Sequence, residues 1–118
     1  MTRIYKLLDR SNWEAALAGG RFDGSPVDLA DGYIHFSAAD QAGETARRYF
    51  RGQAGLMLLT LETDDFPPET AAALRWELSR GGALFPHLYA PLDPALVREA
   101  RAVALDAEGA PLLGELKA

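Results

Sequence analysis

The chain contains no cysteine and only two histidines among 118 residues. Without cysteine, disulfides, thiolate zinc sites and a cysteine nucleophile are excluded. Two histidines would need carboxylate partners to complete a structural zinc site, so we expect no metal. No stretch approaches the roughly 20 apolar residues of a membrane-spanning helix, and the charged start MTRIYKLLDR lacks the apolar core of a signal peptide. We therefore expect a cytoplasmic protein without a membrane partner.

Positive charge is also scarce. The 12 basic residues are outnumbered by 17 acidic ones, which gives a net charge of −5 and an isoelectric point near 4.9. The one basic cluster, Arg47, Arg48 and Arg51, is typical of the solvated side of a helix. Because binding to nucleic-acid phosphates needs concentrated positive charge, the sequence argues against nucleic acid as a partner. A small anionic, nucleotide-like ligand stays open, since one or two arginines suffice to hold it.

Length and composition predict a single domain. Hydrophobic residues at 48% and charged residues at 25% are typical of globular proteins. A chain of 118 residues leaves no room for a second domain. We expect residues 1–118 to fold together, with a core over about 3–113.

Hydrophobic patterns predict an α+β fold with a mixed or split β-sheet and two main helices. Strands are predicted at residues 2–8, 33–36, 56–61, 74–78, 87–89, 97–105 and 111–113. The run at 56–61, LMLLTL, is the candidate for the central buried strand. Residues 21–31 are dense in turn formers and predict a loop. The tail after Gly114 is expected to fray.

Two capping-box patterns mark the starts of the two main helices. Ser11 is followed by Glu14, and Ser37 is followed by Asp40, as a capping box requires. The second box would also place a helix N-terminus, a natural anion site, beside His35.

Three of the predicted strands have unusual polar sides. Because side chains alternate along a strand, each segment has an apolar side and a polar side. The polar sides carry Tyr33, His35 and Ser37, then Arg75 and Glu77, then His87 and Tyr89. These side chains can form hydrogen bonds to a ligand or transfer protons. We expect the polar sides to meet around one cleft, and the apolar sides, such as Leu74, Trp76 and Leu78, to face the core.

These residues also have simpler structural interpretations. His35 can donate to a backbone carbonyl, and Ser37 can act as a helix cap. Arg75 and Glu77 can form a surface ion pair worth less than ~1 kcal/mol. Ser37, His87 and Glu77 have the residue types of a catalytic serine–histidine–acid triad, but the sequence has no nucleophile-elbow motif. It also lacks glycine-rich phosphate-binding loops and the HExxH zinc motif.

Several segments together resemble a known family. IYKLL, DGYIHFS and LRWELSRGGALFPHLY, followed by PL, occur in this order over roughly residues 3 to 113. In these segments the chain resembles the bacterial family called domain of unknown function 952. That family is grouped with the ADP-ribosyltransferase superfamily by remote similarity. The resemblance implies a split β-sheet that clamps NAD in a cleft.

The resemblance also assigns residues to the superfamily motifs. The middle-strand motif matches His35 and Ser37, and the late acidic residue matches Glu77. The first-strand position falls near Lys6, where many superfamily members have a histidine. A lysine can still donate to a ribose hydroxyl or a phosphate, but it cannot accept a hydrogen bond.

Roles in an NAD-dependent reaction follow from this assignment. Glu77 would stabilise the oxocarbenium-like state that forms when the nicotinamide–ribose bond breaks. His35 and His87 would position ribose or phosphate, and Tyr89 would stack on a ring. Arg75 or Arg80 would bind the pyrophosphate.

Two other functions stay open from the sequence. The first is a non-catalytic module that binds a small ligand or a partner, which the lysine at position 6 favours. The second is a different small hydrolase or transferase that uses His35 and His87 as acid and base.

Overall fold

The computed structural model describes residues 2–118, apart from the side chain of Arg80. Its strands are β1 (Arg3–Asp9), β2 (Ile34–His35), β3 (Ser37–Ala38), β4 (Leu56–Glu62), β5 (Leu74–Leu78), β6 (Leu84–Leu88) and β7 (Val97–Val103). Its helices are α1 (Arg10–Gly19), α2 (Pro26–Asp31), α3 (Ala42–Tyr49) and α4 (Pro68–Ala73), with 3-10 turns η1 (Thr63–Asp65), η2 (Arg80–Gly82) and η3 (Pro94–Leu96). None of the helices in residues 2–118 is both long enough and apolar enough to cross a membrane.

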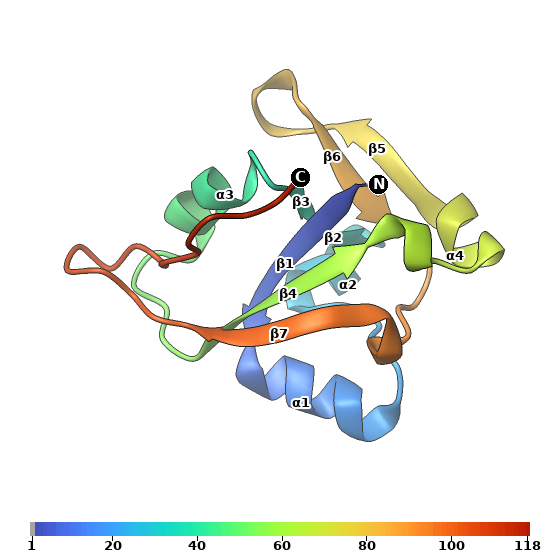
Figure 1. Cartoon of the computed structure of the whole chain (residues 1–118), viewed down its shortest axis with the longest axis horizontal. Helices are drawn as coiled ribbons and strands as arrows, with labels where there is room; N and C mark the ends of the chain where they lie inside the picture. Colours follow the sequence, from blue (N-terminus) through green and yellow to red (C-terminus); the bar gives the residue numbers. More distant parts are fainter. Residues whose placement is uncertain (1) are drawn as a thin grey trace.

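The strands form two separate sheets, with the orders β3-β1-β4-β7 and β2-β6-β5. The sequence predicts a mixed or a split sheet, and the presence of two sheets confirms the split one. Every strand pair in the described part of the chain is antiparallel, so neither sheet is mixed. β4 lies between β1 and β7, and all seven of its residues are buried. This confirms LMLLTL as the central strand. Figure 1 shows the β5–β6 hairpin standing beside and above the larger sheet.

The larger sheet has a hydrophobic cluster on each face. Alternation along β1 and β4 sends neighbouring side chains to opposite faces. One cluster joins Ile4, Leu8, Met57, Leu59 and Leu61 to residues of α1, β2 and β6. The other joins Tyr5, Leu7, Leu56 and Leu58 to residues of α3 and the C-terminal segment. The helices α1 and α3 therefore cover opposite faces of the sheet (Figure 1).

The two sheets separate at Phe36, between β2 and β3. The Phe36 N–H donates to the carbonyl oxygen of Pro86 at 3.0 Å. Proline has no N–H with which to return the bond, so the β2–β6 ladder cannot continue beyond this point. The next residue, Ser37, pairs instead with Tyr5 on β1. Because β3 pairs only with Ile4 and Tyr5, no strand among residues 2–118 covers the rest of β1 on this side.

Both predicted capping boxes are wrong. α1 begins at Arg10, and its N-cap residue Asp9 makes no side-chain capping bond. Ser37 does not cap a helix, because it lies in β3 and α3 begins later, at Ala42. Pairing with Tyr5 holds Ser37 extended, which overrides the local preference of serine for a cap.

The segment 21–31, expected to be a loop, contains the helix α2. Pro26 lies in its first turn, and the Ser25 N–H donates to Asp28 Oδ2 at 2.8 Å. That bond is the reciprocal half of a capping box. Gly32 ends the helix with φ of 89°, a left-handed conformation that favours glycine.

The C-terminal segment lies against the face of the larger sheet that carries α3. Leu113 is 7% exposed, and Leu116 packs against the same cluster. The Tyr5 hydroxyl donates a hydrogen bond to the backbone oxygen of Lys117. The expectation of a frayed tail is therefore wrong.

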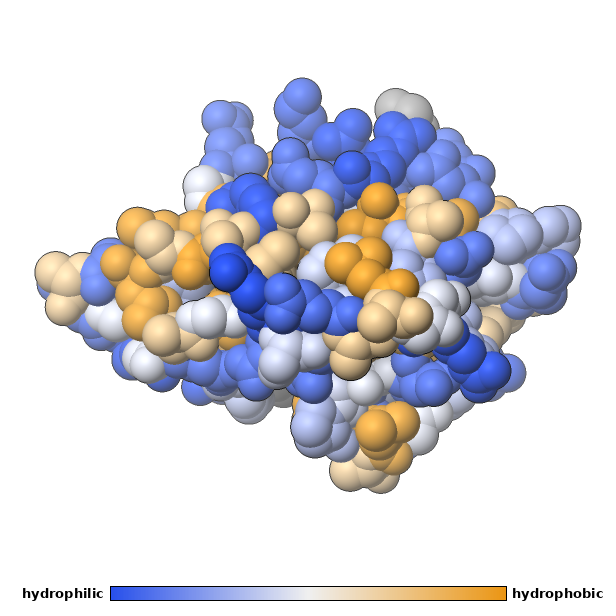
Figure 2. Space-filling view, turned by 90° about the horizontal axis from the view of Figure 1, so that it is seen from below, coloured by the Kyte–Doolittle hydropathy of each residue, from blue (hydrophilic) through white to orange (hydrophobic). Residues whose placement is uncertain are grey.

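The β5–β6 hairpin leaves apolar side chains in solvent. Leu74 packs against the core at the base of β5, whereas Trp76 is 40% and Leu78 is 73% exposed. Leu84, which is opposite Leu78 on β6, is 51% exposed. The expectation that this side of β5 faces the core is wrong beyond Leu74. On another face, seen from the side of α1, Figure 2 shows apolar patches broken up by hydrophilic residues, as is usual for protein surfaces.

Candidate functional site

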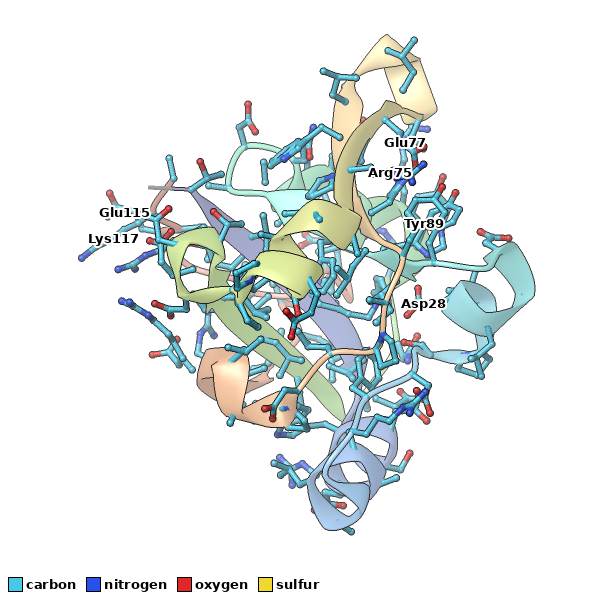
Figure 3. All side chains as sticks on the ribbon, turned by 90° about the vertical axis from the view of Figure 1, so that its right-hand side faces the viewer. Asp28, Arg75, Glu77, Tyr89, Glu115 and Lys117 are labelled. Carbon is cyan, nitrogen blue, oxygen red and sulfur yellow. The ribbon has the colours of Figure 1, made fainter. Side chains whose placement is uncertain are left out.

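The polar sides of β2, β5 and β6 meet on one face of the smaller sheet. His35 on β2 is directly opposite His87 on β6, and His87 is opposite Arg75 on β5. The ring centroids of the two histidines are 5.5 Å apart, in an edge-to-face arrangement. Figure 3 shows Arg75, Glu77 and Tyr89 side by side. Alternation along three short strands therefore brings these side chains together.

His35 is held between two carboxylates of α2. Its Nδ1 lies 2.6 Å from Asp28 Oδ1, and its Nε2 lies 2.9 Å from Asp31 Oδ2. The Asp28 side chain is fully buried, whereas the side chains of His35 and Asp31 are 30% and 46% exposed. Asp28 thus fixes the orientation of the imidazole and leaves its Nε2 edge facing Asp31 and solvent.

Lys6 forms a buried ion pair with Asp28. Its Nζ lies 2.9 Å from Asp28 Oδ2, and it also donates to the carbonyl oxygen of His35 at 2.9 Å. The backbone N–H of His35 donates to Asp28 Oδ1 at 3.1 Å. No strand of the described residues pairs with β2 on the side away from β6. The two charged side chains satisfy the backbone groups that a neighbouring strand would otherwise pair.

Burial and pairing act in opposite directions on the two charged groups. Burial alone would raise the pKa of Asp28, but the hydrogen bond from His35 and the charge of Lys6 outweigh it and hold that pKa well below its ordinary value. Burial lowers the pKa of Lys6, and the nearby carboxylate of Asp28 offsets only part of this effect. Each charge therefore depends on the other for its place in the interior.

A second group of polar side chains lies on and beside β5 and β6. Glu77 Oε1 accepts a hydrogen bond from the Tyr89 hydroxyl at 2.7 Å and lies 2.9 Å from His87 Nδ1. The bonds from Tyr89 and then His87 lower the pKa of Glu77, and the same carboxylate raises the pKa of Tyr89. The Arg75 guanidinium carbon lies 5.0 Å from the centroid of the Tyr89 ring, within cation–π range.

Tyr33 joins the two groups. Its ring centroid is 4.6 Å from that of His35, 4.2 Å from that of His87 and 5.1 Å from that of Tyr89. His87 is only 3% exposed, so it forms the floor beneath these rings. A ligand on this face would contact His35, Tyr33 and Tyr89 directly, and would reach His87 only through them.

A cavity of about 550 Å³ adjoins His35 at the split between the sheets. Three predicted site residues line it, Lys6, His35 and Ser37, together with Asp9, Asp28, Asp31, Tyr33 and Tyr49. The other predicted residues, Arg75, Glu77, His87 and Tyr89, are not among its lining residues. The single cleft expected from the sequence therefore consists of two adjoining parts, a cavity at His35 and an open face at Glu77, with Tyr33 between them.

Two of the predicted ligand-binding residues make structural contacts within the chain. Ser37 is 5% exposed, and its Oγ lies 3.2 Å from Thr45 Oγ1, which ties β3 to α3. The hypothetical triad with His87 and Glu77 is not formed, because Ser37 bonds elsewhere. The Lys6 ammonium is directed at Asp28 and the His35 backbone. The predicted role of the Arg80 side chain lies outside the described residues.

Sequence reasoning misses Asp28 and Asp31, the two carboxylates that hold His35. A signal for the first is present, since Ser25-Pro26-Val27-Asp28 has the spacing of a capping box with proline at the first helical position. No local pattern shows that this carboxylate turns inward to meet a histidine. In residues 2–118, no group of three or more His, Asp or Glu side chains has the arrangement to hold a metal ion.

We expect the change Tyr89→Phe to raise the pKa of Glu77 toward its ordinary value. The variant removes the strongest hydrogen bond to the ionised carboxylate and leaves His87 in place. The measurement is an NMR titration of the side-chain carboxyl signals. An unchanged Glu77 titration would mean that the hydroxyl does not stabilise the carboxylate.

The fold and site define a small α+β domain with two antiparallel sheets and an aspartate-anchored histidine at the gap between them. The sequence profile of the family described as "Protein of unknown function (DUF952)" matches residues 7–100. The chain belongs to this family, which confirms the resemblance seen in the sequence.

Solved structures of one bacterial protein are similar to this chain. The crystal structure of Protein CC0527 from Caulobacter crescentus is 54% identical over 95% of both chains, with a TM-score of 0.87. The solution NMR structure of CC0527 is 56% identical over 97% of this chain and 95% of that chain, with a TM-score of 0.83. The comparison with curated proteins finds no significant match.

Proposed function

We propose that this chain is an ADP-ribosyltransferase-like domain that binds NAD or a related nucleotide in the cavity beside His35. The observation that carries the proposal is the position of this histidine. It stands in the wall of a cavity of about 550 Å³, which is of ligand size, and a buried carboxylate fixes its ring. The split into two antiparallel sheets is the arrangement that the superfamily resemblance implies.

The charges around the cavity favour one end of NAD over the other. Asp9, Asp28 and Asp31 line the cavity. Among the described residues that line it, Lys6 is the only lysine or arginine, and it is already paired. A pyrophosphate would meet these carboxylates unfavourably, whereas the nicotinamide ring of NAD carries a positive charge. We therefore place the nicotinamide–ribose end in the cavity. The pyrophosphate would lie outside, toward Arg75.

A non-catalytic binding module is the second candidate. Glu77, the carboxylate expected to stabilise an oxocarbenium-like state, does not line the cavity and already accepts hydrogen bonds from Tyr89 and His87. This position supports binding without turnover. The third possibility, with His35 and His87 as acid and base, is less well supported because His87 is buried.

The test is an NMR titration with NAD up to about 1 mM, which is the range of weak specific binding. We expect the ring signals of His35 and Tyr33 to shift, and NADH, which has an uncharged dihydronicotinamide ring, to bind more weakly. The change Asp31→Asn should weaken NAD binding about tenfold, the usual effect of losing one charged hydrogen bond. The matched control is Asp23→Asn, which removes an exposed carboxylate outside the cavity.

Absence of any shift at His35 and Tyr33 would contradict the proposal. The release of nicotinamide separates the two candidates. A module predicts no release, and it predicts that Glu77→Gln binds NAD as the wild type does. A transferase predicts release by the wild type that Glu77→Gln abolishes.

A further inference from the structure

The strand β5 is an open edge with complementary charges on it. It is the last strand of the smaller sheet and pairs with β6 without any register shift. The strand also contains no proline. A bulge and a proline are two features with which proteins usually protect an edge from pairing with another chain, and β5 has neither. Its apolar side chains Trp76 and Leu78 are 40% and 73% exposed. Figure 1 shows the hairpin projecting from the rest of the chain, with β5 on its outer side.

The backbone bonds show which residues of β5 face the open edge. The carbonyl of Ala73 accepts from Tyr89, and the N–H of Ser79 donates to Ala83, so both residues face β6. Backbone direction alternates along a strand, so Arg75 and Glu77 also face β6. Trp76 and Leu78, which lie between them, therefore present their N–H and C=O groups to the open edge. Leu74 presents only its C=O group there, because its N–H donates to the carbonyl oxygen of Ala71 at the end of α4. The position of Pro86 opposite Trp76 agrees with this, since proline has no N–H to share with it.

The sequence of β5, Leu-Arg-Trp-Glu-Leu, is symmetric about Trp76 apart from the opposite charges at positions 75 and 77. We propose that β5 is an interface with a second copy of this chain, in which the two β5 strands pair antiparallel about a two-fold axis at Trp76. Each strand would then face its own image, as an isologous interface requires.

This register satisfies the backbone and the charges together. Trp76 is opposite its own copy, and Leu74 is opposite Leu78. The two Trp76 residues exchange two hydrogen bonds, and each Leu78 N–H donates to the Leu74 carbonyl of the other copy, so about four hydrogen bonds form. Arg75 of each copy is directly opposite Glu77 of the other, at the non-hydrogen-bonded positions where side chains come closest. On the other side of the sheet, the exposed apolar side chains of both copies form one continuous surface.

Neighbouring registers are worse for a physical reason. A two-fold axis at position 75 sets Arg75 opposite its own copy, and an axis at position 77 does the same for Glu77. Like charges directly opposite each other are destabilising. A shift by one residue would turn side chains to opposite faces and bring inward-facing backbone groups to the interface. The charge pattern thus selects the axis at Trp76.

The pairing also affects the candidate site. Glu77 already accepts hydrogen bonds at Oε1 from Tyr89 and His87. The guanidinium of Arg75 from the second copy would arrive on the same side of the sheet, next to this carboxylate. A second copy would therefore add a positive charge to the open face of the site. Under the proposed function, the pyrophosphate of NAD lies on this face.

The test is analytical ultracentrifugation of the full chain from about 1 µM to about 1 mM, because a single strand pair is a small interface with modest affinity. We expect the wild type to dimerise in this range. Arg75→Glu and Glu77→Arg each place like charges opposite each other, and each variant alone should be monomeric. Mixed in equal amounts, the two variants should form a heterodimer, because every opposed pair again has opposite charges.

A second pair of variants checks the apolar side. Leu78→Lys is expected to shift the dimer toward monomer. Leu29→Lys is the matched control and should not, because Leu29 on α2 is also mostly exposed, at 63%. Formation of the heterodimer also shows that both charge variants are folded. A wild type that stays monomeric up to about 1 mM, variants that still dimerise alone, or a mixture that stays monomeric would each overturn the proposal.

Discussion

The change Asp28→Asn is expected to lower the free energy of unfolding by about 3–5 kcal/mol, the usual effect of removing one partner of a buried ion pair. Asparagine has nearly the same shape and can still accept a hydrogen bond from the His35 backbone. The loss therefore comes mainly from the charge. The Lys6 side chain, which is 5% exposed, would be left in the interior without a counter-charge.

The pH dependence of this effect has a definite sign. The pKa of Asp28 is lower in the folded chain than in the unfolded chain, so its contribution is fully present above the unfolded value of about 3.9. That contribution is lost as the pH falls below this value. We expect the difference in unfolding free energy between the wild type and Asp28→Asn to be largest near neutral pH and to shrink below about pH 4.

Urea unfolding at several pH values measures both effects. The matched control is Asp23→Asn, because Asp23 forms an exposed pair with Arg21 in the same part of the chain. This control should change stability by no more than about 0.5 kcal/mol. Equal stability of Asp28→Asn and the wild type at neutral pH would show that the Lys6–Asp28 pair does not support the fold.

The change Leu113→Ala is expected to lower the free energy of unfolding by about 2–5 kcal/mol. Leu113 is 7% exposed and belongs to the cluster that covers Tyr5 and Leu7 on the α3 side of the sheet. Truncation removes apolar contacts and leaves a cavity that the neighbouring residues only partly fill. A loss of this size would confirm that the segment around Leu113 is part of the core.

The adjacent residue provides the control. Leu112 is 51% exposed, so Leu112→Ala should change the stability by no more than about 0.5 kcal/mol. Thermal or urea unfolding of the two variants gives the comparison directly. If both changes had the same small effect, the segment would not be held against the sheet.

The sequence predicts those features that depend on local periodicity. The run LMLLTL has no polar side, so it fits only a strand covered on both faces, and β4 is such a strand. Alternation also places His35, Glu77, His87 and Tyr89 on the polar sides of their strands. Their mutual contacts follow once those strands pair.

Features that depend on distant contacts could not be predicted in this way. Ser37 has the local pattern of a helix cap, but pairing with β1 holds it extended. The inward turn of Asp28 depends on the edge of β2 that faces away from β6, which no strand of the described residues covers. Periodicity identifies the apolar side of β5, but it does not tell whether the chain itself covers that side.

The buried ion pair between Lys6 and Asp28 ties β1 to α2 across the gap between the two sheets. Its side chains are 5% and 0% exposed, so dissolved ions cannot come between them. The pair of Arg98 and Asp65 is half open to solvent and is screened as ionic strength rises. We therefore expect this link between β1 and α2 to hold from dilute buffer to concentrated salt, while exposed pairs weaken.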